Sequence, residues 1–170
     1  MWRRQQPLAT ATYVKYTASS GLPDAVLCTG ITLTYNDLSA SRDDVQEVSV
    51  GTNVEAIGAG AFRSMYSLKK VVVPGSTWHI GFESFIYCYE LADVLLSEGV
   101  RVLNGKTFYG SGLPSLVIPS SVSSIGGSSF GYCQYLTSLA FKGKSLQQVS
   151  AMANYPWGLA DASVISAELS

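Results

Sequence analysis

The sequence predicts an α/β repeat fold, namely a right-handed solenoid of short parallel strands with 3₁₀ or helical turns and non-repeat caps. The first observation is an Ile-Gly-x-x-x-Phe step at residues 57–62, 80–85 and 125–130, with a weaker copy at residues 103–108. The second is that the phenylalanines of these copies lie 23, 23 and 22 residues apart, a period typical of solenoids. The third is that two short apolar segments of strand-like composition precede each copy.

Composition limits the classes of function. The chain has 170 residues, of which 47% are hydrophobic and 14% are charged, and its net charge is -1. This predicts one domain with a substantial core. A nucleic-acid partner is not expected, because such partners require clustered Lys and Arg on a basic domain. Membrane insertion is not expected either, because no apolar run reaches the length of a membrane span.

Residues 1–44 do not carry the repeat, and we expect them to cap or anchor the solenoid. Strand formers alternate at residues 13–17, and a second strand is predicted within residues 25–35. Residues 20–24 predict a turn between them, and the polar residues 36–44 predict a loop. The first coil of a solenoid leaves an open apolar edge that a flanking segment must cover. The alternative is an anchor that docks into a larger assembly.

Residues 45–141 carry the repeats, and each coil contains two apolar segments. In the first segment the outer positions are apolar and the middle position varies, which predicts a strand whose outer side chains face the core. These segments are residues 48–50, 71–73, 94–96, 116–118 and 139–141. The second segment ends at the residue that starts the Ile-Gly step, at Ile57, Ile80, Leu103 and Ile125.

The glycine that follows the isoleucine of the step is expected to allow a sharp bend or a positive φ. A short helical or 3₁₀ turn is then predicted to direct the phenylalanine inward, starting at Gly60, Glu83, Lys106 and Ser128. The third coil is one residue shorter between Phe108 and Leu113 and contains Gly110, Ser111 and Gly112. A tighter connection is expected there.

Residues 113–133 read Leu-Pro-Ser-Leu-Val-Ile-Pro-Ser-Ser-Val-Ser-Ser-Ile-Gly-Gly-Ser-Ser-Phe-Gly-Tyr-Cys. They resemble the BspA-type leucine-rich repeat, whose consensus is roughly Leu-x-x-Val-x-Ile-Pro-x-Ser-Val-x-x-Ile-Gly-x-x-Ala-Phe-x-x-Cys. The resemblance covers about residues 45–141 and is weakest at residues 94–108, where the proline and the Ile-Gly pair are missing. It implies a leucine-rich-repeat solenoid that serves as an interaction scaffold, found on bacterial surface adhesins and in bacteriophage-encoded proteins. It transfers no catalytic motif.

Residues 142–170 are predicted to form a C-terminal cap made of a short helix and a strand. Ser145 and Gln148 form a capping-box pattern, and an amphipathic spacing follows at Leu146, Val149 and Met152. Residues 164–165 predict the final strand. This tail also resembles the endings of repeat proteins encoded by gut bacteriophages and prophages.

The sequence contains no constellation of catalytic residues, so a non-enzymatic protein without cofactor or metal is expected. His79 is the only histidine, and the carboxylates Asp43 and Asp44 lie in a polar stretch. Cys88 and Cys133 occupy the same repeat position two coils apart, about 10 Å from each other, which is too far for a disulfide. They are expected to be small buried hydrophobic residues.

Tyrosines gather in one short part of the repeat, between the phenylalanine and the next leucine. Stacking of the coils is expected to bring them to one edge, where tyrosine offers rigid contact area with a polar tip. The alternative is that several pack against the neighbouring coil. The residues of this candidate binding edge are Tyr66, Tyr87, Tyr89, Tyr109, Tyr132 and Tyr135.

A second candidate binding surface is the outward face of the strands, at Val72, Leu95 and Val117, flanked by Ser49 and Ala140. An exposed apolar patch on a soluble domain suggests a partner. No charged residue occurs between Lys106 and Lys142, so self-association or burial in a larger assembly is also expected to be favourable.

These observations predict a binding or adhesion module whose partner is a protein or glycan on a cell surface. Residues 1–7 lack the apolar core of a signal peptide, which favours a bacteriophage virion component, such as a tail or capsid decoration, as the setting. The alternatives are a bacterial cell-surface adhesin fragment and a structural subunit whose apolar solenoid face is buried in a homo-oligomer.

Overall fold

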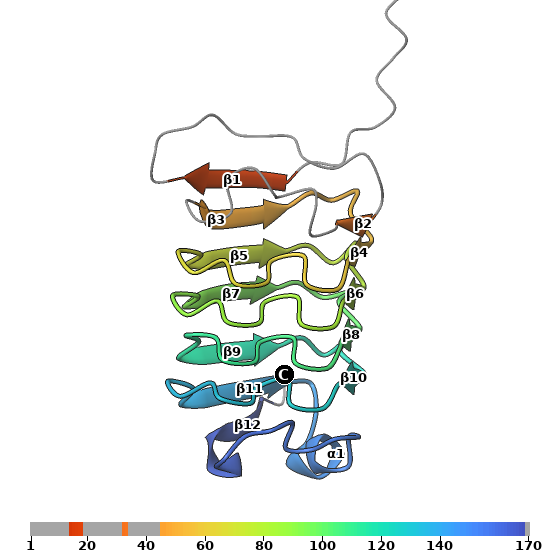
Figure 1. Cartoon of the computed structure of the whole chain (residues 1–170). Helices are drawn as coiled ribbons and strands as arrows, with labels where there is room; N and C mark the ends of the chain where they lie inside the picture. Colours follow the sequence, from red (N-terminus) through yellow and green to blue (C-terminus); the bar gives the residue numbers. More distant parts are fainter. Residues whose placement is uncertain (1–13, 19–31, 34–44, 169–170) are drawn as a thin grey trace, which may run out of the picture.

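The computed structural model describes residues 14–18, 32–33 and 45–168. It is a parallel β-solenoid of about five coils with little helix, as the sequence predicted (Figure 1). The turn predicted at residues 20–24, the loop predicted at residues 36–44 and Cys28 lie outside the described residues.

The longer strands stack in one column, and two-residue strands form a second column beside them (Figure 1). In the first column β1 runs antiparallel to β3, and the other pairs are parallel. Its strands are β1 (Val14–Ala18), β3 (Val45–Val50), β5 (Lys70–Val73), β7 (Asp93–Leu96), β9 (Ser115–Ile118), β11 (Ser138–Lys142) and β12 (Ile165–Glu168). The second column is β2 (Thr32–Leu33), β4 (Ala56–Ile57), β6 (His79–Ile80), β8 (Val102–Leu103) and β10 (Ser124–Ile125).

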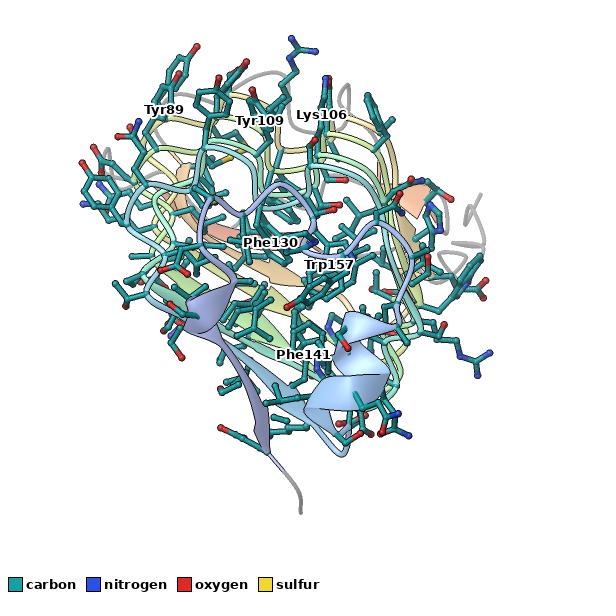
Figure 2. The ribbon with its side chains drawn as sticks, turned by 90° about the horizontal axis from the view of Figure 1, so that it is seen from below. Tyr89, Lys106, Tyr109, Phe130, Phe141 and Trp157 are labelled. Carbon is teal, nitrogen blue, oxygen red and sulfur yellow. The ribbon has the colours of Figure 1, made fainter. Side chains whose placement is uncertain are left out.

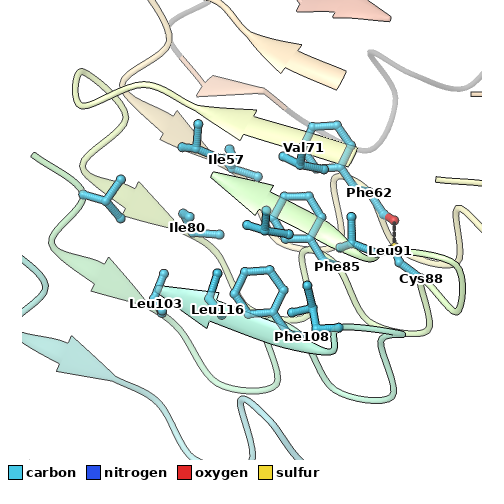
Figure 3. Close-up of a cluster of buried hydrophobic side chains, with 14 of the residues drawn as sticks. Ile57, Phe62, Val71, Ile80, Phe85, Cys88, Leu91, Leu103, Phe108 and Leu116 are labelled. Atoms are coloured by element: carbon cyan, nitrogen blue, oxygen red, sulfur yellow. Dashed lines mark hydrogen bonds between the residues drawn. The ribbon is translucent and has the colours of Figure 1, made fainter. Parts of the chain in front are cut away.

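The phenylalanines of the repeat form a stack along the axis of the solenoid, as Figure 3 shows for three of them. Parallel register places equivalent residues of successive coils above one another, so the rings lie face to face. Their centroids are 4.8 Å apart between Phe62 and Phe85, 5.4 Å between Phe85 and Phe108, and 5.9 Å between Phe108 and Phe130. All four are buried, together with Ile57, Ile80, Leu103 and Ile125. The predicted core role of the step is confirmed.

The glycine of the step serves a different purpose from the one expected. Gly81 and Gly126 are absent from the residues with positive φ, so neither of them makes a left-handed bend. Instead, the coils approach so closely that a Cβ on Gly81 would lie 2.7 Å from the Ile57 carbonyl oxygen. A Cβ on Gly126 would similarly collide with the backbone of Asn104 and Gly105. The glycine is required because there is no space for a side chain between two backbones.

The predicted turn at each phenylalanine is present as isolated 3₁₀-type turns, in which the N–H three residues on donates to the carbonyl of Gly60, Glu83, Lys106 or Ser128 at 3.0–3.3 Å. These turns do not continue into a helix. Gly60, Glu83, Lys106 and Ser128 all have φ between 54° and 63°. These left-handed residues reverse the sense of winding, so the segment runs along the coil instead of closing into a helix. Alternate N–H groups are thereby free to donate to the next coil, as from Phe62 to the Ser84 oxygen at 2.9 Å. We call these segments, at residues 60–64, 83–87, 106–110 and 128–132, the turn wall. The hydrogen bonds between them form a third ladder beside the two strand columns.

The sheet of longer strands divides between β7 and β9. These strands are neighbours, but the described residues contain a four-stranded sheet that ends at β7 and a separate three-stranded sheet that includes β9. At the equivalent position of other coils an N–H donates to the preceding coil, as from Ala92 to the Lys69 oxygen and from Thr137 to the Pro114 oxygen. Pro114 has no N–H to donate, so the ladder is interrupted where the short third coil returns to the sheet.

The C-terminal segment closes the solenoid by imitating a further coil. The capping box is confirmed, with Ser145 and Gln148 bonding each other's backbone N–H at the start of α1 (Leu146–Ser150). Val149 is buried as expected, whereas Leu146 is exposed. The buried Trp157 lies between Phe130 and Phe141 in the interior (Figure 2).

Two ladders end on cap residues. The Trp157 carbonyl accepts from the Phe130 N–H at 3.1 Å, in the place of a next coil. The Asn154 side-chain amide donates to the Ile125 carbonyl at 3.2 Å, where earlier coils use a backbone N–H. β12 extends the strand column in parallel to β11. The last coil therefore has a hydrogen-bonding partner for its longer strand, for its short strand and for its turn wall.

We predict that Phe85→Ala lowers the free energy of unfolding by about 3–5 kcal/mol, because it removes a ring from the middle of the buried stack. Phe82→Ala is the matched control. Phe82 is 45% exposed, so its loss should cost about 1 kcal/mol or less. Urea denaturation of both variants measures the difference, and equal losses would contradict the assigned core role.

We predict that Gly126→Ala destabilises the protein by more than about 2 kcal/mol, because its Cβ would collide with backbone atoms that cannot move aside. Gly127→Ala should be close to neutral, because the nearest atom to its Cβ is the Asn154 side-chain oxygen at 3.8 Å. Thermal or urea unfolding of these adjacent substitutions checks the prediction. A mild effect of Gly126→Ala would show that coil spacing does not depend on this glycine.

Candidate functional site

Five of the six predicted tyrosines form a continuous chain of ring contacts along one edge of the solenoid. Tyr66 stacks on Tyr89 with centroids 5.6 Å apart and an angle of 7° between the ring planes. The chain continues from Tyr89 through Tyr87 to Tyr109 and then to Tyr132, with centroid distances of 5.1–6.0 Å. Viewed along the axis, Tyr89 and Tyr109 point outward from the same edge (Figure 2). Tyr87 and Tyr109 are half-buried between neighbours, and the remaining predicted tyrosines are exposed.

A hollow of about 580 Å³ opens in this edge. It is lined by Gly110, Ser111 and Gly112 of the short third coil, together with tyrosines of that coil and of the coils on either side. The missing residue and the two glycines remove the side chains that would otherwise fill the column at this coil. The complete lining is Tyr87, Tyr89, Tyr109, Gly110, Ser111, Gly112, Tyr132, Gln134 and Tyr135.

Two of the wall tyrosines have a strained backbone. Tyr87 and Tyr132 both have φ of 58°, and they occupy the repeat position at which Ser64 and Gly110 also have positive φ. A bulky residue in the left-handed region is uncommon and costs about 1–2 kcal/mol relative to the right-handed region. Glycine would satisfy this backbone without strain. Non-glycine residues with positive φ also occur at Glu83, Lys106 and Ser128, so this conformation is a property of the repeat.

The hollow has no charged lining residue among the described residues. A cation beside this edge is Lys106, whose Nζ lies 5.8 Å from the centroid of the Tyr109 ring and 3.5 Å from a Glu83 carboxylate oxygen. Desolvation and the neighbouring Tyr132 and Tyr87 raise the pKa of Tyr109 above its ordinary value. Its hydroxyl therefore remains protonated at neutral pH and able to donate. The site offers aromatic faces and neutral hydrogen-bonding groups.

A second hollow, of about 500 Å³, lies beside the first, between the last coil and the C-terminal cap. Tyr132 and Gln134 belong to both linings, so they stand between the two. Cys133 contributes to this second hollow, and burial raises the pKa of its thiol. A thiol with a raised pKa is a poor nucleophile.

The strand face is smaller than predicted. Leu95 is 52% exposed and Val117 is 42% exposed, but Val72 is only half-exposed and Ala140 is buried. The expectation that Ala140 points into solvent is wrong. Leu95 and Val117 also lie on opposite sides of the division between β7 and β9, where a shallow hollow of about 300 Å³ separates the two sheets. The apolar patch is therefore interrupted.

The cysteines and the histidine have structural surroundings. The sulfur atoms of Cys88 and Cys133 each lie within 3.1 Å of a phenylalanine carbonyl oxygen of the preceding coil. His79 makes an edge contact with the exposed Trp78. No group of three or more metal-binding side chains occurs within residues 14–18, 32–33 and 45–168. In that same part of the chain, no helix has both the length and the apolar character needed to cross a bilayer.

A sequence profile of the BspA type leucine rich repeat region matches residues 40–155 in six copies. The chain belongs to this family. Domains of the BspA-type family are typically non-enzymatic binding modules. No curated protein matches the chain.

Two solved structures share the fold at low sequence identity. A leucine-rich repeat protein from Bacteroides ovatus is 20% identical, with a TM-score of 0.53 over 73% of this chain and 37% of its own. The pneumococcal vaccine antigen PcpA is 16% identical, with a TM-score of 0.62 over 91% of this chain and 34% of its own. The BspA-type chain described here thus spans about a third of the length of each.

We predict that Tyr132→Gly keeps the free energy of unfolding within about 1 kcal/mol of the original protein, because glycine relieves the left-handed strain and Tyr132 is 72% exposed. Tyr132→Ala is the control and should be about 1 kcal/mol less stable than Tyr132→Gly. Urea unfolding compares the two. Equal stability of the alanine and glycine variants would contradict the left-handed conformation.

Proposed function

We propose that the chain is a non-enzymatic binding module displayed at a bacterial cell surface and that the tyrosine edge contacts its partner. The observation that carries the proposal is the uncharged hollow that is lined by tyrosines of successive coils. Hollows of several hundred Å³ with aromatic walls and a few polar groups are typical of ligand sites. Tyrosine also provides contact area with little loss of side-chain entropy on binding.

Membership of the BspA-type family supports the bacterial surface as the setting, because the resemblance implies surface adhesins. The description of PcpA as a vaccine antigen is in keeping with such a setting. The virion setting, which the sequence alone favoured, receives no support from these comparisons, since neither solved structure is described as a bacteriophage protein. We therefore adopt the adhesin alternative.

The test uses the fluorescently labelled chain and measures its binding to cultured epithelial cells and to bacterial cells. The combined variant Tyr89→Ser, Tyr132→Gly and Tyr135→Ser should lose binding at least tenfold, because it removes both walls of the hollow while Tyr132→Gly preserves the backbone. Leu95→Ser is the matched control, an exposed apolar residue on the strand face, and should keep full binding. Unchanged binding of the combined variant would refute the tyrosine edge as the contact surface.

A second candidate function is a structural role in which the strand face is buried in a homo-oligomer. The observation in its favour is the exposure of Leu95 and Val117 on neighbouring strands. Exposed apolar side chains of this kind favour association. If this role is correct, sedimentation finds the original chain as an oligomer and Leu95→Lys as a monomer. A monomeric original chain excludes it.

A further inference from the structure

The hollow in the tyrosine edge lies where one aromatic ring is missing from a column of stacked rings. Tyr66 and Tyr89 occupy the same repeat position in successive coils, and their rings are stacked. The third coil places Gly112 at that position, and a Cβ there would collide with the Tyr89 carbonyl oxygen. One face of the Tyr89 ring is covered by Tyr66, and the tilted Tyr87 ring lies beside it with the centroids 6.0 Å apart. The next place in the column is part of the hollow.

The next coil contributes Gln134 and Tyr135 to the lining of the hollow, and Gln134 occupies the same repeat position as Tyr89 two coils away. Successive coils lie about 4.8 Å apart, so the groups on either side of the gap are separated by roughly 10 Å. That distance admits a single ring, packed on both faces at van der Waals separations of about 4 Å. The shape of the site therefore indicates a ligand that presents one ring.

The chemistry of the lining selects among such ligands. Five tyrosines and the Gln134 amide line the hollow, and none of the lining residues is charged. An acidic ring, such as a uronic or sialic acid, or a nucleotide with its phosphate would be desolvated here without a cation. A cationic ring would be attracted to the tyrosine faces, but no lining residue carries a carboxylate to neutralise its charge. The ligand is expected to be neutral.

A neutral ring must also provide partners for the polar rim. An aromatic side chain of a partner protein would cover the tyrosine hydroxyls and the Gln134 amide without hydrogen-bonding to them, which costs free energy. A hexopyranose has C–H groups that pack against an aromatic face and hydroxyl groups around its circumference. Its C–H groups can pack against the tyrosine rings, and its hydroxyl groups can form hydrogen bonds with the polar groups of the rim. The hollow of about 580 Å³ leaves room for adjoining sugar units.

We propose that the hollow binds one hexopyranose ring of a neutral glycan between Tyr89 on one side and Gln134 and Tyr135 on the other. This inference rests on the proposed function as a binding module and adds the class of ligand. Tyr66 lies outside the lining, although it is an exposed tyrosine of the same column, and it supplies the matched control.

The experiment is calorimetric titration of the complete chain with maltotriose, mannotriose and β-1,4-galactotriose, followed by an array of neutral glycans. Trigalacturonate, sialyllactose and the peptide acetyl-Gly-Tyr-Gly-amide are compared under the same conditions. At least one neutral glycan should bind at least tenfold more tightly than the acidic sugars and the peptide. Tyr89→Ser and Tyr135→Ser should each weaken that binding about tenfold, whereas Tyr66→Ser should change it less than twofold.

Several results would overturn the inference. One is the absence of binding to any neutral glycan, and another is tighter binding of the peptide, which would indicate a protein partner. A third is equal weakening by Tyr66→Ser and Tyr89→Ser, which would indicate a general effect on the edge. If labelled chain binds cells through the tyrosine edge but binds no neutral glycan, only the present inference fails. If it binds neither, the proposed function fails as well.

Discussion

The close approach of each backbone to the backbone of the next coil is the constraint on which the rest of the structure depends. Three ladders hold the coils at this distance: the longer strands, the short strands and the turn wall. Gly81 and Gly126 are required where the approach leaves no space for a Cβ. The same spacing brings the phenylalanine rings into a continuous stack. Packing and hydrogen bonding therefore require the same separation, so each supports the other.

Because the coils are stacked in register, a change in the length of one coil alters only the surface near that coil. In a globular core, the loss of one residue is commonly absorbed by rearrangement of its neighbours. Here, the coils before and after the shortened third coil remain in register, as the stacked rings of Phe85, Phe108 and Phe130 show. The shorter third coil instead leaves a hollow in the tyrosine edge. The sheet also divides in this coil, beside Pro114.

The ends of the solenoid need partners for groups that a further coil would otherwise satisfy. The C-terminal cap provides them with unlike residues: a tryptophan in place of a phenylalanine, an asparagine amide in place of a backbone N–H, and β12 in place of a repeat strand. A capping segment needs only to match the positions of donors, acceptors and apolar surface. This is why it need not share the repeat sequence.

The sequence by itself determined the repeat, its strands and its core, because hydrophobic periodicity and fixed spacing report directly which side chains face inward. It also indicated that the tyrosines lie on one edge, since the same part of each repeat is stacked along the solenoid. It did not reveal the left-handed residues of the turn wall, because Glu83, Lys106 and Tyr87 are not residue types that indicate positive φ. Nor did it indicate that Ser129 is buried, with its hydroxyl 2.9 Å from the Asn104 carbonyl oxygen.

Only the tertiary structure decided which surfaces are available. Ala140 is buried and Leu95 is exposed although both occupy the middle of a strand segment, because exposure depends on the neighbours of each coil. The hollow is a property of three coils together, formed by what the third coil lacks and what its two neighbours retain. The spacing of residues along the sequence indicates which side chains contact one another within the repeat. A missing side chain forms a hollow only when the coils on either side hold their own side chains in place.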